Sequence, residues 1–378
     1  MSSSSEGLWQ YLKRQSFPRN RGESSSGVRP VRVGPSAPVG TLSGVLSRES
    51  TQILVNSGVL DQMQTPSGML RPVGLICETV NICNADCVFC PYSLQTRQYG
   101  TMSQETFEAV CRQYDALGGG PFSLTPMVGD FLLDRELPSR LKMLWRYRYS
   151  IVPSVTTNLY ALDRLPDDVI AEMLEVFTRI HVSTYGITQE ENSEITRRNH
   201  FKKYRPQAQR IGSLWERSSG RCDIKVGFRN LHDYPPEVLR DFVLDNFGHD
   251  WCLGGTIRYS NWGNTMSGPL PGDAEWSPAR ENHTTCMLLV ASMQVYWDGR
   301  VSACACCDYN AGKELALGDI HENNLTDIYN SAVNQLIWKR QESGEMQSIC
   351  QRCTFHVPLS DLSTKLADKG MWFDFVGG

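Results

Sequence analysis

The chain has 378 residues, 40% of them apolar, so it can bury a large core in one big domain or in two. Its net charge of -4 and isoelectric point near 6.0 do not favour nucleic acid or an anionic membrane as a partner. No apolar run is as long as a membrane span and no signal-type segment follows the N-terminus, so we expect a cytoplasmic protein.

Residues 1–71 are rich in Ser, Gly and Pro and show little apolar patterning. This composition predicts a flexible or loosely docked N-terminal extension. A transit peptide would also be rich in Arg and Ser, but a disordered tail fits the composition better. Within this extension, only residues 51–63 suggest a short helix.

From residue 72 onward, strand-like apolar runs alternate with amphipathic helical runs. We expect six strands, at residues 72–80, 122–128, 150–158, 179–186, 223–232 and 254–262. The helices between them are expected at residues 103–117, 138–147, 165–177, 201–215 and 235–247. Ser103 suits the N-cap of the first helix, and Pro206 weakens the prediction of the fourth.

Strands that alternate with helices form parallel βαβ units, which predicts the α/β class. Six strands favour a partial (β/α)6 TIM-like barrel over a complete barrel of eight. In such folds the chemically active side chains gather at the C-terminal ends of the strands. The loop after the first strand is therefore expected to carry active-site residues.

That loop holds three of the chain's 13 cysteines, Cys83, Cys87 and Cys90, in the sequence CNADCVFC. Clustered cysteines in a reducing compartment indicate metal or redox chemistry rather than disulfides. A structural zinc site takes four protein ligands, and a four-iron cluster has one iron at each of four corners. Three local thiolates therefore suit an iron–sulfur cluster with one open iron, and the alternative is a zinc site completed by a distant ligand.

This loop resembles the C-x3-C-x-aromatic-C loop of the radical S-adenosylmethionine (SAM) enzymes, with Phe89 in the aromatic position. The resemblance implies that SAM chelates the open iron and is reductively cleaved to a 5′-deoxyadenosyl radical, which abstracts hydrogen from a substrate. It also implies a reducing partner such as flavodoxin or ferredoxin.

The resemblance extends to residues expected to contact SAM. Gly129 and Asp130, in MVGDFLLD, stand where the family commonly carries a Gly-Gly-Glu stretch, with Asp in place of Glu. Asn158, in TTNLYAL, matches a Thr-Asn-Gly turn, and Ser183, in HVSTYG, matches a SAM-binding hydroxyl. The alternative for Asn158 and Ser183 is ordinary turn chemistry at a strand end.

A second set of cysteines lies near the C-terminus, with separations of 18 (286 to 304), 46 (304 to 350) and 3 (350 to 353). This spacing resembles the SPASM extension of radical SAM enzymes, or its shorter Twitch form, which holds auxiliary four-iron clusters. No cysteine follows residue 353, which fits the Twitch form and one second [4Fe-4S] cluster. The resemblance implies four ligands: Cys286, Cys304, Cys350 and Cys353.

Two further cysteines, Cys306 and Cys307, either exchange into this site or stay free. We favour free thiols, because the spacing is complete without them.

These patterns predict five parts of the chain. They are the N-terminal extension (1–71), the radical SAM partial barrel (72–265), a linker (266–284), the auxiliary cluster domain (285–360) and a C-terminal tail (361–378).

Two catalytic candidates lie near the ends of later strands. Arg258 suits a carboxylate of the substrate or of SAM, although an ion pair with a neighbouring acid is the commoner role of such an arginine. Tyr185, like His181 and His232, suits a general acid or base, although a lone Tyr or His near a strand is more often structural.

Two reactions remain open. The 18-46-3 spacing resembles single-cluster dehydrogenases of aminoglycoside pathways, which implies oxidation of a sugar or aminocyclitol alcohol in natural-product or glycan biosynthesis, with the auxiliary cluster as electron acceptor. The alternative is a maturase that cross-links or epimerises a ribosomally made peptide. Residues 1–71 lack the helical periods of a leader-binding domain, which favours the small molecule. A non-enzymatic iron–sulfur or zinc scaffold would require the resemblance to be accidental.

Overall fold

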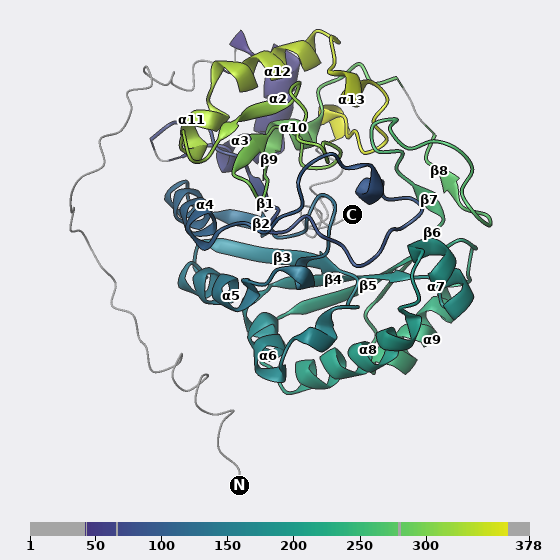
Figure 1. Cartoon of the computed structure of the whole chain (residues 1–378). Coiled ribbons are helices and arrows are strands. Elements are labelled where there is room, and N and C mark those ends of the chain that lie inside the picture. The colour runs from purple at the N-terminus through teal and green to yellow at the C-terminus, as the bar shows by residue number, and fades with distance from the viewer. Residues whose placement is uncertain (1–41, 43, 66, 279–280, 362–378) are drawn as a thin grey trace. The chain divides into compact units, whose positions relative to one another are not determined.

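The computed structural model describes residues 42, 44–65, 67–278 and 281–361. Six strands stand side by side in chain order, and every neighbouring pair is parallel. The predicted α/β partial barrel is thereby confirmed (Figure 1). The strands are β1 (Gly74–Cys77), β2 (Gly120–Ser123), β3 (Ile151–Thr157), β4 (Arg179–Tyr185), β5 (Asp223–Arg229) and β6 (Cys252–Thr256).

The five predicted helices lie along one side of these strands (Figure 1). They are α4 (Gln104–Ala116), α5 (Leu137–Arg146), α6 (Asp167–Val176), α8 (Phe201–Glu216) and α9 (Pro236–Phe247). The Ser103 hydroxyl accepts the Thr106 amide at 3.1 Å and caps α4 as expected. Pro206 lies inside α8, within its second turn. Between β4 and β5 lies a helix that was not predicted, α7 (Gln189–Thr196), which the Thr188 hydroxyl caps.

The C-terminal segment continues the barrel sheet instead of forming a separate layer. Strand β9 (Ser292–Val295) pairs parallel with β1, and β10 (Arg300–Ser302) and β11 (Ala316–Asp319) extend the sheet antiparallel. The resulting order is β11-β10-β9-β1-β2-β3-β4-β5-β6. The short helices of this segment are α10 (Met287–Ala291), α11 (Leu325–Tyr329), α12 (Ala332–Glu342), α13 (Ser348–Gln351) and η5 (Leu359–Asp361).

The described part of the N-terminal extension differs from the flexible segment that its composition predicted. It forms α2 (Arg48–Asn56) and α3 (Val59–Gln62), and the side chains of Leu54, Val59 and Met63 are fully buried. The Glu342 carboxylate, on α12, accepts the Ser47 amide at 2.9 Å and the Ser50 hydroxyl at 2.7 Å. A few apolar residues at helical spacing are thus enough to form these two helices, because the C-terminal segment packs over them. The predictions for residues 1–41 and 362–378 concern parts of the chain outside the described residues.

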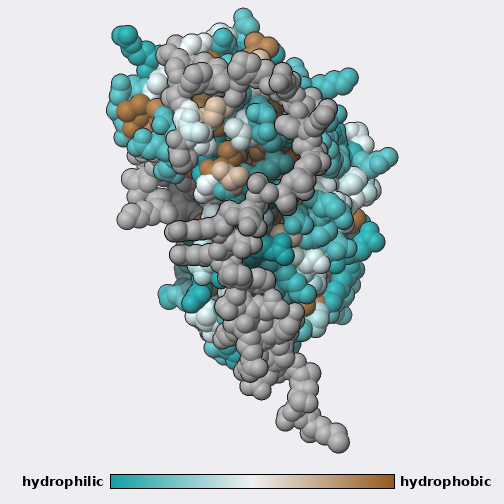
Figure 2. Space-filling view, turned by 90° about the vertical axis from the view of Figure 1, so that its left-hand side faces the viewer, coloured by the Kyte–Doolittle hydropathy of each residue, from teal (hydrophilic) through white to brown (hydrophobic). Residues whose placement is uncertain are grey.

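Few large apolar side chains are exposed among the described residues. On the face in Figure 2, hydrophobic residues form small groups bordered by hydrophilic ones. The exposed examples include Val55, Leu94, Tyr149 and Leu336. Within the ranges that the structure describes, no helix combines the length and the apolar character needed to cross a membrane.

Candidate active site

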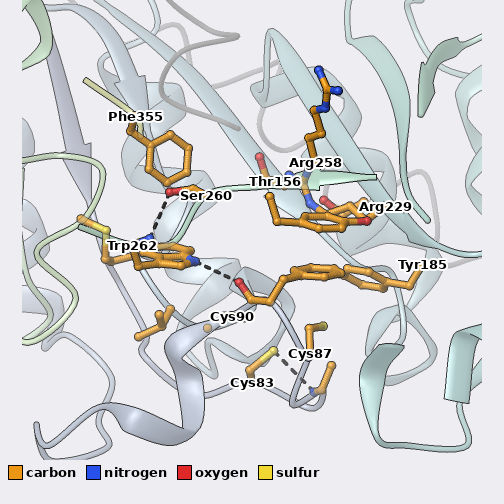
Figure 3. A pocket seen from close by; sticks show the side chains of 17 residues that line it. Cys83, Cys87, Cys90, Thr156, Tyr185, Arg229, Arg258, Ser260, Trp262 and Phe355 are labelled. Atoms are coloured by element: carbon orange, nitrogen blue, oxygen red, sulfur yellow. Dashed lines mark hydrogen bonds between the residues drawn. The ribbon is translucent and has the colours of Figure 1, made fainter. Parts of the chain in front are cut away.

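The first cysteine group lies at the C-terminal end of the barrel strands. Cys83, Cys87 and Cys90 lie on the loop between β1 and the short helix η2 (Pro91–Leu94). All three line a cavity with a volume of about 210 Å³ (Figure 3). The other walls come from the ends of β3, β4 and β5, from residues 127–129 after β2, and from residues 258–262. This is where a partial barrel is expected to collect its chemistry.

Phe89 is held in place by aromatic residues from the far side of the cavity. Its ring stacks on Tyr259, with centroids 4.0 Å apart and an interplanar angle of 7°. The Trp262 indole donates to the Phe89 carbonyl at 3.0 Å (Figure 3). The Tyr259 hydroxyl in turn donates to the Asn230 carbonyl at 2.6 Å. These contacts fix the backbone between Cys87 and Cys90, so the spacing of the two thiols does not depend on a metal alone.

Burial dominates the acidity of the three thiols. It raises the pKa of Cys83 and of Cys87, and it raises the pKa of Cys90 to about 11. The Tyr185 hydroxyl and the nearby Arg229 cation lower the pKa of Cys87 but do not offset its burial. The thiols are therefore protonated at neutral pH, and a bound cluster must displace their protons.

The glycine of the MVGD stretch is required by its surroundings. Gly129 has φ of +152°, and a Cβ there would lie 3.0 Å from the Val80 carbonyl and 3.2 Å from the Asn81 Cα. This close approach brings the loop after β2 against the start of the cysteine loop, and Gly129 lines the cavity. Ser183, on β4, also lines the cavity, as does Thr156 on β3, which the sequence did not single out.

Asp130 lies outside the cavity that its neighbour Gly129 lines. Its buried carboxylate accepts the Thr157 hydroxyl at 3.0 Å, the Asn158 amide at 2.8 Å and the Leu132 amide at 3.0 Å. It does not line the cavity that the described residues form. Burial raises its pKa, and these donors partly offset the rise. Contact with SAM stays a prediction for Asp130, since its oxygens here join the loop after β2 to the end of β3.

Asn158 supports the cysteine loop rather than lining the cavity. Its amide nitrogen donates to the Asn84 side chain at 2.8 Å and lies 4.0 Å from the Cys83 sulfur. Its amide oxygen accepts the Tyr160 backbone N–H at 3.0 Å, the turn bond typical of an Asn after a strand. SAM binding stays a prediction for Asn158.

Of the two catalytic candidates, one lies inside the cavity and the other at its edge. Tyr185 is half-buried beside Cys87, and desolvation raises its pKa, so it is a protonated donor and not a base at neutral pH. The Arg258 side chain is 68% exposed and pairs with Glu275 at 2.5 Å. Glu275 begins β8 (Glu275–Trp276), which pairs with β7 (Arg258–Tyr259). This ion pair is the ordinary alternative that the sequence left open for Arg258.

Arg229, at the end of β5, is a cation that faces the cavity. Its charge acts on Cys87, Cys90 and Tyr185, and its guanidinium has neither an ion pair nor a hydrogen bond with the described residues. It is half-buried in the cavity lining (Figure 3). An arginine in this position suits a bound carboxylate or phosphate.

The second cysteine group is brought together by polar side chains from distant segments. The Asn282 amide donates to the carbonyls of Cys350 and Cys353, at 2.8 and 3.0 Å. The Cys286 amide donates to the Gln341 side chain at 3.3 Å. Burial raises the pKa of Cys350, and the charges of Cys304, Cys286 and Cys353 raise it further.

Cys307 lies against this second group. Its sulfur is 3.2 Å from the Cys353 sulfur, and this contact lowers the pKa of Cys353 and raises that of Cys307. The backbone amides of Cys306 and Cys307 both point to the Cys304 sulfur, at 3.4 and 3.3 Å.

A residue close in sequence to the second cysteine group reaches the cavity of the first. Phe355, two residues after Cys353, lines the cavity that holds the first group (Figure 3). Its ring lies 5.7 Å from the Trp262 ring, edge to face. No group of three or more His, Cys, Asp or Glu side chains in the described ranges is placed so as to hold a single metal ion. Three thiols on one loop beside an open cavity fit a cluster with a free iron.

Comparisons with known families agree with this reading. Residues 77–218 match the radical SAM superfamily, and residues 286–354 match the SPASM iron–sulfur cluster-binding domain. The chain belongs to the radical SAM superfamily and carries a C-terminal SPASM domain. It is a radical SAM enzyme, and its cofactors are SAM, the SAM-binding [4Fe-4S] cluster and one or more auxiliary iron–sulfur clusters. The family assignment made from the cysteine loops is confirmed.

Solved structures share the fold at low sequence identity. SuiB of Streptococcus suis, bound to the precursor peptide SuiA, superposes with a TM-score of 0.53 at 13% identity, over 96% of this chain and 83% of SuiB. BtrN, in complex with AdoMet (SAM) and 2-DOIA, superposes with a TM-score of 0.50 at 17% identity, over 75% of this chain and 93% of BtrN. No curated protein matches the chain significantly in sequence.

Proposed function

We propose that this enzyme oxidises an alcohol of a small sugar-like molecule to a ketone, with the auxiliary cluster as electron acceptor. The observation that carries the proposal is that the C-terminal segment reaches the cavity of the first cysteine group. Cys83, Cys87 and Cys90 line it from one side, and Phe355, next to the second cysteine group, lines it from another. A substrate there would lie between the two groups, as an oxidation that passes an electron to the second cluster requires.

The proposed ligands of the SAM-binding cluster are Cys83, Cys87 and Cys90, and those of the auxiliary cluster are Cys286, Cys304, Cys350 and Cys353. When bound, SAM and the two clusters supply abstraction of a hydrogen atom from carbon and uptake of a second electron. The chain's own part is to position and shield the reactants. Phe89, Tyr259 and Trp262 pack beside the thiols, and Arg229 supplies a positive charge for a carboxylate. We propose that this carboxylate is that of SAM.

The cavity lining bears on the choice between a sugar and an aminocyclitol. It contains Arg229 and Arg258, and none of the described residues that line it is Asp or Glu. A cationic aminocyclitol would be bound most readily by carboxylates, which this lining lacks, whereas the hydroxyls of a neutral sugar can exchange hydrogen bonds with Ser183. The lining therefore favours a neutral sugar alcohol over an aminocyclitol.

A peptide substrate is the second candidate, and the edge of the cavity supports it. The side chains of Arg258 and Glu275 are both more than half exposed there. Their ion pair is worth little, so a longer substrate can displace it and enter with a side chain. For either substrate we expect a flavodoxin or ferredoxin as the reducing partner.

The test is turnover of the anoxically reconstituted enzyme with SAM, a reductant and three substrate panels: neutral sugar alcohols, aminocyclitols and peptides. We expect release of 5′-deoxyadenosine with a neutral sugar alcohol and a product two hydrogens lighter by mass spectrometry. A Cys286→Ala/Cys350→Ala variant is the matched control, which should still cleave SAM but form no ketone. Turnover of peptides alone, or a product of unchanged mass, would contradict the proposal.

A further inference from the structure

The 18-46-3 spacing leaves Cys306 and Cys307 unused, and of these two Cys307 has a sulfur contact with a proposed ligand. Its side chain is buried, with only 1% of the residue exposed. Its sulfur lies 3.2 Å from the Cys353 sulfur, so the two atoms are in direct contact. Among the cysteines of this segment, Cys353 is one of the four ligands proposed from the spacing. The spare thiol therefore lies beside a proposed ligand and not elsewhere in the core.

The backbone fixes this placement. The loop from Cys304 to Cys307 wraps around the Cys304 sulfur, which accepts both the Cys306 and the Cys307 amide. The Cys307 carbonyl accepts the Tyr309 amide at 2.8 Å. A loop held at both ends in this way keeps the Cys307 sulfur directed toward the cysteines of the auxiliary site.

Contact between two sulfurs limits what both can do. The irons of a four-iron cluster lie at four separate corners, and each takes one protein thiolate. Thiolates on two different irons lie well apart, so two sulfurs 3.2 Å from each other cannot both bind irons without moving, and in these positions only one of them takes an iron. The other remains as a thiol within reach of the same iron.

We propose that Cys307 is a reserve ligand of the auxiliary cluster, which takes the iron of Cys353 when Cys353 is absent or displaced. This inference rests on the proposed auxiliary ligands and not on the identity of the substrate. Cys307 also lines a second cavity of about 270 Å³, together with Asp308, Lys313 and Glu314. The exchange of ligands would thus take place at the wall of a cavity separate from the one that holds the first cysteine group.

The test counts iron in a protein that can hold only the auxiliary cluster. Cys83, Cys87 and Cys90 are replaced by Ala to give the background, which is then reconstituted anoxically. We expect about four irons per chain in this background and in its Cys353→Ala derivative. Adding Cys307→Ala to Cys353→Ala should remove the cluster. Adding Cys306→Ala instead should leave it, because no sulfur contact holds Cys306 against Cys353.

A Cys350 variant and a spectroscopic signal provide two further measurements of ligand exchange. Replacing Cys350 by Ala should remove the cluster on its own, because no spare sulfur contacts Cys350. The electron paramagnetic resonance signal of the reduced cluster should shift in the Cys353→Ala derivative, which reports a new ligand independently of turnover. Circular dichroism of each apoprotein checks that it is folded.

Four results would overturn the inference. Two concern cluster content: loss of the cluster in Cys353→Ala to the same extent as in Cys350→Ala, and retention of the cluster when Cys353 and Cys307 are both absent. The other two are an unshifted signal in Cys353→Ala and a background protein that holds no iron. The last would overturn the proposed auxiliary ligands as well. The substrate proposal is tested separately by product mass, so the two can fail independently.

Discussion

The buried ion pair between Arg97 and Glu78 links the first cysteine loop to the auxiliary segment, and its removal should be costly. The guanidinium donates to both Glu78 oxygens, at 2.5 and 2.9 Å, and its Nε donates to the Tyr309 carbonyl at 2.7 Å. The two side chains are 2% and 0% exposed. The guanidinium also lies 4.7 Å from the centre of the Tyr296 ring.

Arg97→Leu would leave the Glu78 carboxylate buried without its partner. Removing one member of a buried pair costs about 3–5 kcal/mol, whereas replacing both members by apolar residues is often nearly neutral. We therefore expect Arg97→Leu to lower the free energy of unfolding by about 3–5 kcal/mol at pH 7. The double variant Glu78→Leu/Arg97→Leu should lose less than Arg97→Leu alone.

The pH dependence gives a second check on the same variant. Burial raises the pKa of Glu78, and Arg97 opposes the rise, so without Arg97 the folded pKa is higher still. A raised carboxyl pKa destabilises the fold only above the unfolded pKa, because there the unfolded chain is ionised while the folded one holds its proton. The deficit of Arg97→Leu should thus be larger at pH 7 than at pH 5. Anoxic urea unfolding, followed by tryptophan fluorescence, measures the free energy of unfolding at both pH values. A pH-independent loss below about 1 kcal/mol would refute the reasoning.

Three further predictions concern single side chains. The pKa of Glu342 is raised by burial, but bonds from Thr285, Ser50 and Ser47 outweigh this and lower it below its usual value. Such a group stabilises the fold above its unfolded pKa and loses that effect as pH falls through its folded pKa. Glu342→Gln should therefore cost about 1 kcal/mol at pH 7 and nothing near pH 3, and equal losses in urea unfolding at both pH values would count against this. Asp130→Asn should cost about 2–3 kcal/mol, since the carboxylate accepts several buried donors, but should leave the Kd for SAM within about twofold. A large change in that Kd by calorimetry, with stability unaltered, would support the direct SAM contact that the motif predicts. Arg229→Met should raise the Kd for SAM about tenfold, the effect of a lost charged hydrogen bond, and Arg229→Lys should recover part of it. An unchanged Kd in the Met variant would show that Arg229 serves something other than SAM.

Much of the barrel could be predicted because its signals are local. Strand-like runs alternate with amphipathic helices at short spacing, and Ser103 marks the start of α4 where a capping residue should stand. The cluster loop is equally local, since all three cysteines fall within eight residues. Such features depend on neighbours in the chain and so are visible in the sequence.

Features that depend on distant partners were missed. The pairing of Gly74 with Ser292 joins the C-terminal strands to the barrel, and the sequence around neither residue predicts it. The same holds for the burial of Leu54 and Val59, whose helices fold against a segment nearly 300 residues away. The motif match singled out Asp130 but did not show where its carboxylate points. Phe355 was missed for the same reason, because its place in the cavity follows only from the packing of the C-terminal segment.

The most direct test of the account is the iron and sulfide content of the anoxically reconstituted chain and of its Cys83→Ala/Cys87→Ala/Cys90→Ala variant. We expect about eight irons and eight sulfides per chain in the parent and about four of each in the variant, one four-iron cluster for each cysteine group. If the parent holds only about four irons and the variant none, the second cysteine group binds no iron–sulfur cluster. The proposed electron acceptor would then be lost, and a redox-neutral radical reaction would replace the alcohol oxidation.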